Sequence, residues 1–120
     1  MDESLVAQDL ANSRLDCNRS AISAEGRLRH QQLRARICAA RLSSSAIAQG
    51  YSVRLSEARL TLQELSEWIG LERQCCPWLV LQVERITPHT LELRMTGPDR
   101  AKPILSAELE DFLETNHLGK

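Results

Sequence analysis

Pro77, which directly follows two adjacent cysteines, is the residue that most constrains the fold of this chain. Apolar residues at helical spacing stop at Cys75, and a nearly continuous apolar run typical of a strand begins at Trp78. Because a proline ring disfavours helical geometry at the residue before it, a helix that reaches the pair must end near Cys75. The sequence therefore predicts a junction between a helix and a strand, with the thiols of Cys75 and Cys76 at that junction.

The size and composition of the chain are those of one small α+β domain. Its 120 residues are 42% hydrophobic but only 3% aromatic, so the core must consist mainly of aliphatic side chains. Fifteen lysines and arginines balance sixteen acidic residues, which argues against a general nucleic-acid or membrane binder. We therefore expect neither a membrane nor a nucleic acid as a partner.

The N-terminal segment and the lack of long apolar runs predict the cellular location. Residues 1–13 contain three acidic side chains and lack the basic-then-apolar pattern of an export signal. No run approaches the roughly 20 apolar residues that a transmembrane helix needs. We expect a cytoplasmic protein whose four cysteines are thiols, because the cytoplasm is reducing.

Residue patterns predict a partly ordered arm over 1–20 and a single α+β domain over 21–120. Ser23 matches an N-cap, and Thr61 with Glu64 forms a capping box, the signature of a helix start. The expected elements are a helix over 24–42, a strand over 47–55, a helix over 61–75, strands over 78–86 and 91–95 joined by a turn, and a last helix after Asp99. The inner stripe of the second helix is expected to contain Leu62, Leu65, Trp68 and Ile69, then Glu72 or Cys76.

This element order, an N-terminal helix followed by β-α-β-β-α, predicts a small three-stranded mixed sheet covered by helices. The first two strands are joined through a helix, so we expect them to lie parallel with a right-handed crossover. The second and third strands form a hairpin. Such a sheet leaves open edges and an incompletely covered face, from which we expect a two-fold homodimer.

The adjacent cysteines are the main chemical signal. Neighbouring side chains of a regular helix diverge by about 100°, but the extended geometry that Pro77 favours at Cys76 lets both sulfurs turn toward one point. A direct bridge between them would form a strained ring, so a reduced dithiol is the expected state. Thiolates are soft ligands, and a convergent pair suits As(III), Hg(II) or Cu(I). The sequence predicts a soft metal or metalloid site at Cys75 and Cys76, whose affinity falls as the pH falls.

Three further residues are assigned to this site. Cys38, on the first helix, is the candidate third thiolate. Arg73, two residues before the pair, is expected to assist ionisation, since a nearby cation favours a thiolate. Trp78 is expected to shield the site from water. Cys17 belongs to the N-terminal arm and is assigned no role.

The remaining patterns disfavour several kinds of site. No Cys-x-x-Cys pair occurs, which disfavours structural zinc and a thioredoxin-like motif. No phosphate-binding glycine loop, nucleophile elbow or acidic metal-ligand run occurs. We therefore name no catalytic residue and expect a binding protein rather than an enzyme. His30, His89 and His117 are interpreted as solvated surface residues.

Two motifs resemble those of a group of small, mostly uncharacterised bacterial proteins. The first is Glu-Arg-x-Cys-Cys-Pro-aromatic at Glu72–Trp78, and the second is Thr-Gly-Pro at Thr96–Pro98, before the terminal helix. The resemblance extends over residues 51–112. Some members accompany heavy-metal resistance genes, so the resemblance favours metal binding; it implies no established activity.

Two other interpretations of the same residues stay open. In the first, the cysteines are buried core residues of a protein-interaction or dimerisation module, which the segregated Arg-rich and acidic segments support. In the second, the pair carries out thiol redox exchange. Labelling of the thiols in the folded protein separates buried cysteines from accessible ones.

Overall fold

The computed structural model describes residues 18–113, and both of its long helices begin where the sequence predicts. Helix α2 (Ala24–Ala40) is capped by Ser23, whose hydroxyl accepts a hydrogen bond from an N–H of the first turn. Helix α3 (Leu62–Cys75) starts with the complete Thr61–Glu64 capping box. Each cap satisfies backbone N–H groups that have no partner inside a helix, so local sequence determines both helix starts.

The other elements complete an α+β fold, as predicted. They are the 3-10 helix η1 (Arg19–Ala21), the strands β1 (Arg41–Ile47), β2 (Gly50–Ser56), β3 (Val80–Thr87) and β4 (Thr90–Thr96), and the helices α4 (Ala101–Glu108) and α5 (Glu110–Leu113). Residues 1–17 of the expected N-terminal arm lie outside the described residues. Within residues 18–113, no helix has the length and hydropathy needed to cross a bilayer.

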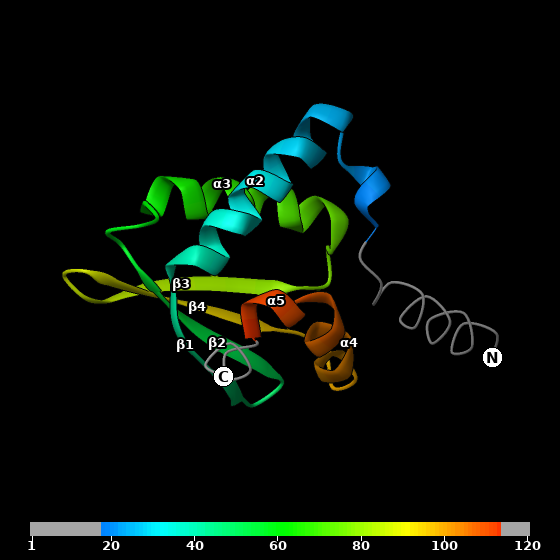
Figure 1. Ribbon diagram of the computed structural model, residues 1–120. Helices are drawn as coiled ribbons and strands as arrows, with labels where there is room; N and C mark the ends of the chain where they lie inside the picture. Colours follow the sequence, from blue (N-terminus) through cyan, green and yellow to red (C-terminus); the bar gives the residue numbers. More distant parts are fainter. Residues whose placement is uncertain (1–17, 114–120) are drawn as a thin grey trace.

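The four strands form one antiparallel sheet in the order β1-β2-β4-β3 (Figure 1). The predicted three-stranded mixed sheet is therefore wrong. Strands β2 and β3 run in the same direction, since each is antiparallel to β4, but β4 lies between them and they are not parallel neighbours. The crossover through α3 skips one position because the β3–β4 hairpin folds back into the place beside β2.

Strand β1 is the element that the sequence pattern does not predict. The segment Ser43–Ser45 has the composition of a helix end, yet α2 ends at Ala40 and β1 begins directly at Arg41. All side chains of β1 are half-buried or exposed, because the strand lies at the edge of the sheet. Its backbone pairs with β2 across a tight turn, in which Gln49 has a φ of 65°. This pairing, rather than apolar alternation, makes the segment a strand.

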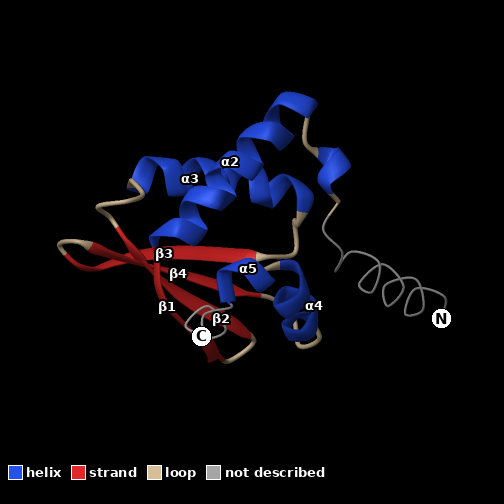
Figure 2. Ribbon diagram, viewed as in Figure 1, coloured by secondary structure: helices blue, strands red, loops and turns tan. Residues whose placement is uncertain are grey.

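Helices α2 and α3 pack against each other over one face of the sheet, and α5 contacts α2, β1 and β2 (Figure 2). The alternation on β4 places Leu91, Leu93 and Met95 in the core with no exposed surface. The opposite face of the sheet is polar and carries Gln82, Glu84, Glu92 and Arg94. The molecule thus has two layers, with one covered and one solvated sheet face.

Trp68 of α3 is the largest fully buried side chain among the described residues. Its ring lies against Phe112 of α5, with ring centroids 5.3 Å apart, so it connects α3 to the C-terminal helices. The predicted burial of Leu65 and Ile69 is confirmed, but Leu62 is 38% exposed. The buried stripe of α3 therefore starts about one turn later than predicted.

Candidate metal centre

The cysteine pair lies at the junction between α3 and β3, where Pro77 predicts a break. Cys75 is the last residue of α3, and Cys76 has a φ of −128° and a ψ of 73°, outside the helical region. The Cys76 N–H donates to the Glu72 carbonyl oxygen at 2.8 Å, and the Cys76 carbonyl accepts from Leu79 at 3.0 Å. The sulfurs of Cys75 and Cys76 are 3.9 Å apart, so the chain turns both toward a common point.

Both sulfurs lie inside the protein rather than at its surface. The exposed fraction is 1% for Cys75 and 0% for Cys76. The Cys75 thiol donates to Oε1 of Glu72 at a sulfur–oxygen distance of 3.9 Å. The two sulfurs therefore converge, but in the core and beside a carboxylate.

A buried imidazole completes the group. His30, from α2, and Glu72, from α3, are 1% and 2% exposed, and Nε2 of His30 lies 2.7 Å from Oε1 of Glu72. Since a carboxylate only accepts hydrogen bonds, the imidazole N–H is the donor. The His30 ring also stacks on Trp68, with centroids 5.8 Å apart and planes inclined by 26°. Packing and hydrogen bonding thus hold the imidazole on the carboxylate that Cys75 also contacts.

The ligand atoms of His30, Glu72 and Cys75 all lie within 4.8 Å of one another. An imidazole nitrogen, a carboxylate oxygen and a thiolate sulfur are donors that bind Zn²⁺ and related ions. Two thiolates on one tetrahedral ion lie roughly 3.8 Å apart, given metal–sulfur bonds of about 2.3 Å. The 3.9 Å between the two cysteine sulfurs is close to that separation. The three donors lie as close together as the ligands of one ion, and the Cys76 sulfur lies beside one of them.

Cys76 is disulfide-bonded, whereas the other two described cysteines, Cys38 and Cys75, are not. The expectation that all four cysteines are thiols is therefore wrong for Cys76. Composition and the N-terminal pattern predict the compartment and its redox conditions. They do not predict which cysteine sulfurs come close enough to form a disulfide. In this state Cys76 offers no thiolate, and the three donors of His30, Glu72 and Cys75 remain.

The structure does not bring the other assigned residues into this group. Cys38 lies on α2 eight residues after His30, which is about 12 Å along a helix axis, and it is not part of the donor group. Arg73 is exposed and donates to a backbone carbonyl of β3 at 3.4 Å. Trp78 is half-buried with its ring over Gly97, where an added Cβ would come within 3.0 Å of it. None of these contacts supports the predicted roles of the three residues.

The surface interpretation of the histidines is confirmed for His89, which is exposed in the turn between β3 and β4. It is wrong for His30, and His117 lies outside the described residues. A signal for His30 is present in the sequence, because it lies three and seven residues before Leu33 and Ile37, on the apolar stripe of α2. A polar residue on such a stripe indicates a hydrogen-bonding partner in the core.

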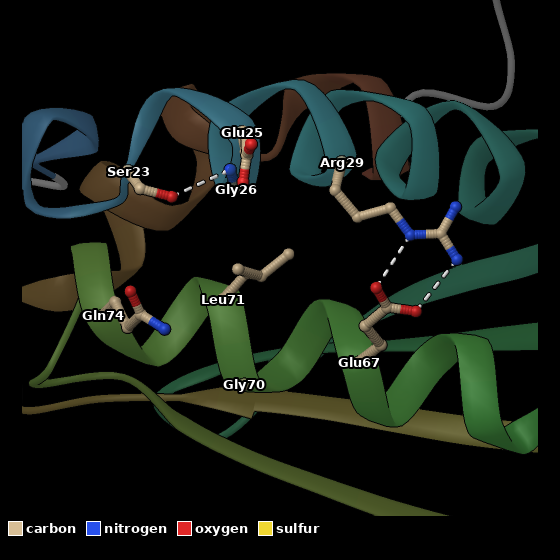
Figure 3. Close-up of a pocket in the computed structure, with 8 residues that line it drawn as sticks. All are labelled: Ser23, Glu25, Gly26, Arg29, Glu67, Gly70, Leu71 and Gln74. Carbon is tan, nitrogen blue, oxygen red and sulfur yellow. Dashed lines mark hydrogen bonds and ion pairs between the residues drawn. The ribbon is translucent and has the colours of Figure 1, made fainter.

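A groove of about 470 Å³ runs along the outer side of the α2–α3 interface (Figure 3). Arg29 and Glu67 bridge it with hydrogen bonds of 2.7 and 2.9 Å, which lower the pKa of the Glu67 carboxyl group from its ordinary value. A second ion pair joins the same two helices, since Arg36 of α2 lies 2.9 Å from Glu64 of α3. The other lining residues are Ser23, Glu25, Gly26, Gly70, Leu71 and Gln74. The groove therefore has charged walls but contains none of the three buried donors.

No protein-family model, no curated protein and no solved structure matches this chain. The likeness to bacterial proteins with a Cys-Cys-Pro motif stays a prediction. Function is therefore inferred from the side chains: a buried imidazole, carboxylate and thiol from two helices, beside a second sulfur.

Proposed function

We propose that the protein binds a thiophilic metal ion between α2 and α3. The ligands are the His30 imidazole, the Glu72 carboxylate and the Cys75 thiolate, and Cys76 adds a second thiolate when its disulfide is reduced. The observation that carries the proposal is the convergence of the first three donor atoms within 4.8 Å in the core. This ligand set enlarges the expected dithiol site, which contained neither His30 nor Glu72.

Burial of these polar groups supports the proposal. A carboxylate and an imidazole in a core cost free energy, and an apolar pair of the same volume is often at least as stable. Trp68, which stacks on His30, has an indole N–H without a hydrogen-bond partner among the described residues. The surrounding core is thus not an extended polar network that would explain the donors. Metal ligation gives nitrogen, oxygen and sulfur donors a reason to lie together there.

The donor types point to a class of ion. A mixed set of one nitrogen, one oxygen and one sulfur suits Zn²⁺ or Co²⁺, which accept all three. A second thiolate shifts the preference toward Hg(II), As(III) or Cu(I), which favour sulfur. Loading requires deprotonation of the Cys75 thiol, because the thiolate is the ligand.

Titration with Co²⁺ tests the proposal, because thiolate-bound Co²⁺ has absorption bands that hydrated Co²⁺ lacks. Wild-type protein, reduced with a phosphine and kept free of oxygen, is expected to bind one Co²⁺ per chain and to release it to Zn²⁺. Cys75→Ser is expected to weaken the sulfur-to-cobalt band, because only the Cys76 thiolate remains, and to bind roughly tenfold more weakly or worse. Cys38→Ser is the matched control, since it removes a thiol outside the donor group, and it should behave as wild type.

The role of the imidazole has its own variant. His30→Asn keeps a polar side chain but removes the ring nitrogen, so it should retain the sulfur-to-cobalt band and lose affinity. Circular dichroism of each variant checks that the fold persists. Equal affinity and equal absorption in wild type and Cys75→Ser would refute the proposal.

A structural role for the cysteines is the second candidate function, and the burial of both sulfurs favours it. In that case His30, Glu72 and Cys75 only join α2 to α3 in an interaction module. A slow thiol reagent separates the two candidates. Bound Zn²⁺ should protect Cys75 from the reagent if the site loads, whereas a structural cysteine reacts at the same rate with and without Zn²⁺.

We also propose that the protein is a cytoplasmic homodimer. Strands β1 and β3 form the two edges of the sheet. Leu42 of β1 and Val80 of β3 are 58% and 50% exposed, so apolar side chains lie along both edges. Pairing of an edge with its copy in a second subunit would satisfy open backbone groups. Light scattering after gel filtration should give twice the chain mass, and a single-chain mass at every concentration would exclude the dimer.

A further inference from the structure

The sulfurs of Cys75 and Cys76 are close together but in different chemical states. Cys76 is disulfide-bonded, whereas Cys75 is not, and its sulfur lies 3.9 Å from the Cys76 sulfur and 3.9 Å from Oε1 of Glu72. Reduction of the disulfide changes the number of thiols beside Glu72 from one to two. The redox state of Cys76 thus determines which donors are present at one place in the core.

We propose that the redox state of Cys76 selects the ion that the protein binds. With the disulfide formed, His30, Glu72 and Cys75 take a borderline divalent ion of the Zn²⁺ class. With the disulfide reduced, Cys75 and Cys76 take a soft ion of the As(III) class, which needs at least two thiolates for a chelate. This inference rests on the metal site proposed above and adds its regulation.

The redox step is a thiol–disulfide exchange with a dithiol reductant. One thiolate of the reductant attacks the disulfide, forms a mixed disulfide with one protein sulfur and displaces the other as a thiolate. The second thiol of the reductant then closes the reductant's own disulfide and releases the remaining protein sulfur. Two electrons and two protons pass to the protein, which gains two thiols. As(III) then displaces the thiol protons of Cys75 and Cys76.

The disulfide does not involve the other described cysteines, since Cys38 and Cys75 are thiols. In the cytoplasm a disulfide is commonly transient and redox-sensing, which fits a switch better than a structural staple.

Paired titrations of the oxidised and the reduced protein test the proposal. Oxidised protein, with its disulfide verified by intact mass, is expected to bind Co²⁺ but not arsenite. After reduction with a phosphine, and removal of the phosphine without oxygen, the affinity for arsenite should rise at least tenfold. Arsenite should then displace Co²⁺ from the reduced protein but not from the oxidised one.

Three variants locate the switch. Cys76→Ala fixes the one-thiol state, so it should keep Co²⁺ binding and bind arsenite weakly with or without reduction; Cys76→Ser repeats the test with a polar side chain. Cys38→Ser is the matched control and should keep the full difference between the two states.

Failure of this inference is distinguishable from failure of the metal site. If Co²⁺ binds in both states and the affinity for arsenite does not change on reduction, selection by Cys76 is overturned and the metal site stands. If neither ion binds in either state, both proposals fall. If Cys76→Ala still shows the rise on reduction, another cysteine is the switch and the assignment to Cys76 is wrong.

Discussion

The interface between α2 and α3 holds two acid–base pairs that are alike in geometry and opposite in environment. Arg29–Glu67 and His30–Glu72 start from consecutive residues of α2, and each has a shortest contact of 2.7 Å to α3. The side chains of the outer pair are 42% and 43% exposed, and those of the inner pair are 2% and 3% exposed. Equal contact distances therefore hide very different energetics.

Access to water explains the difference. At the outer pair, solvent screens both charges and hydrates either partner when the other is lost, so the pair adds little stability. At the inner pair, no solvent replaces a lost partner, and the remaining polar group is left unsatisfied in the core. The inner carboxylate also accepts from Cys75. Stability and the proposed chemistry thus depend on the same side chain, Glu72.

The largest expected effect is that of Glu72→Ala. The change removes the acceptor of both His30 and Cys75, and loss of one partner of a buried pair costs about 3–5 kcal/mol of unfolding free energy. Urea unfolding of the metal-free protein measures the loss. Glu67→Ala is the matched variant of the outer pair. An equal loss of unfolding free energy in Glu72→Ala and Glu67→Ala would contradict the claim that burial makes the inner pair more important.

The double substitution His30→Leu/Glu72→Leu sharpens the comparison, because it removes both polar partners together. Apolar replacement of a buried pair is often neutral or stabilising. The unfolding free energy of the double variant should therefore exceed that of Glu72→Ala by at least about 2 kcal/mol. The same urea experiment measures this recovery. A double variant no more stable than the single one would show that the unsatisfied imidazole is not the cause of the loss.

A smaller effect is expected at the exposed start of α3. Thr61→Ala removes one half of the capping box and should cost about 1 kcal/mol of unfolding free energy. Ser66→Ala, an exposed position inside the same helix, is the control and should change stability little. Thermal unfolding of the two variants measures the difference in stability. Equal melting temperatures would show that the capping box does not stabilise α3.

The smallest effect is confined to acid and concerns the outer pair. The hydrogen bonds from Arg29 hold the pKa of Glu67 below its ordinary value. Its contribution to stability is therefore complete above the unfolded pKa of about 4.3 and is lost as the pH falls through the folded value. The stability advantage of wild type over Glu67→Gln should shrink between about pH 5 and about pH 3. Melting temperatures across this range measure it, and an advantage that grows in acid would contradict the assigned cause.

The sequence predicts well what a few neighbouring residues determine. The Thr61–Glu64 capping box starts α3, and α3 ends just before Pro77. The alternating apolar residues over Leu91–Met95 are buried on one face of the sheet. Caps, proline sterics and the two-residue period of a strand act within a few positions of the chain. For such features the sequence pattern and the folded structure coincide.

Features that need distant segments to meet are predicted poorly. β1 lacks an apolar pattern and becomes a strand through its pairing with β2. His30 and Glu72 are 42 residues apart, and only the packing of α2 on α3 joins them. The disulfide of Cys76 is of the same kind, since residue types do not show which sulfurs approach each other. A histidine on an apolar stripe and a carboxylate on another were the available signals, but neither identifies its partner.

Strand β4 is the last strand along the chain, yet it bonds to both β2 and β3, which do not bond to each other. Until residues 90–96 have been synthesised, β3 has no neighbouring strand, and the sheet that the helices cover is incomplete. A ribosome that has synthesised only residues 1–89 therefore holds a chain in which nothing yet lies between β2 and β3, so the core cannot close before β4 is made.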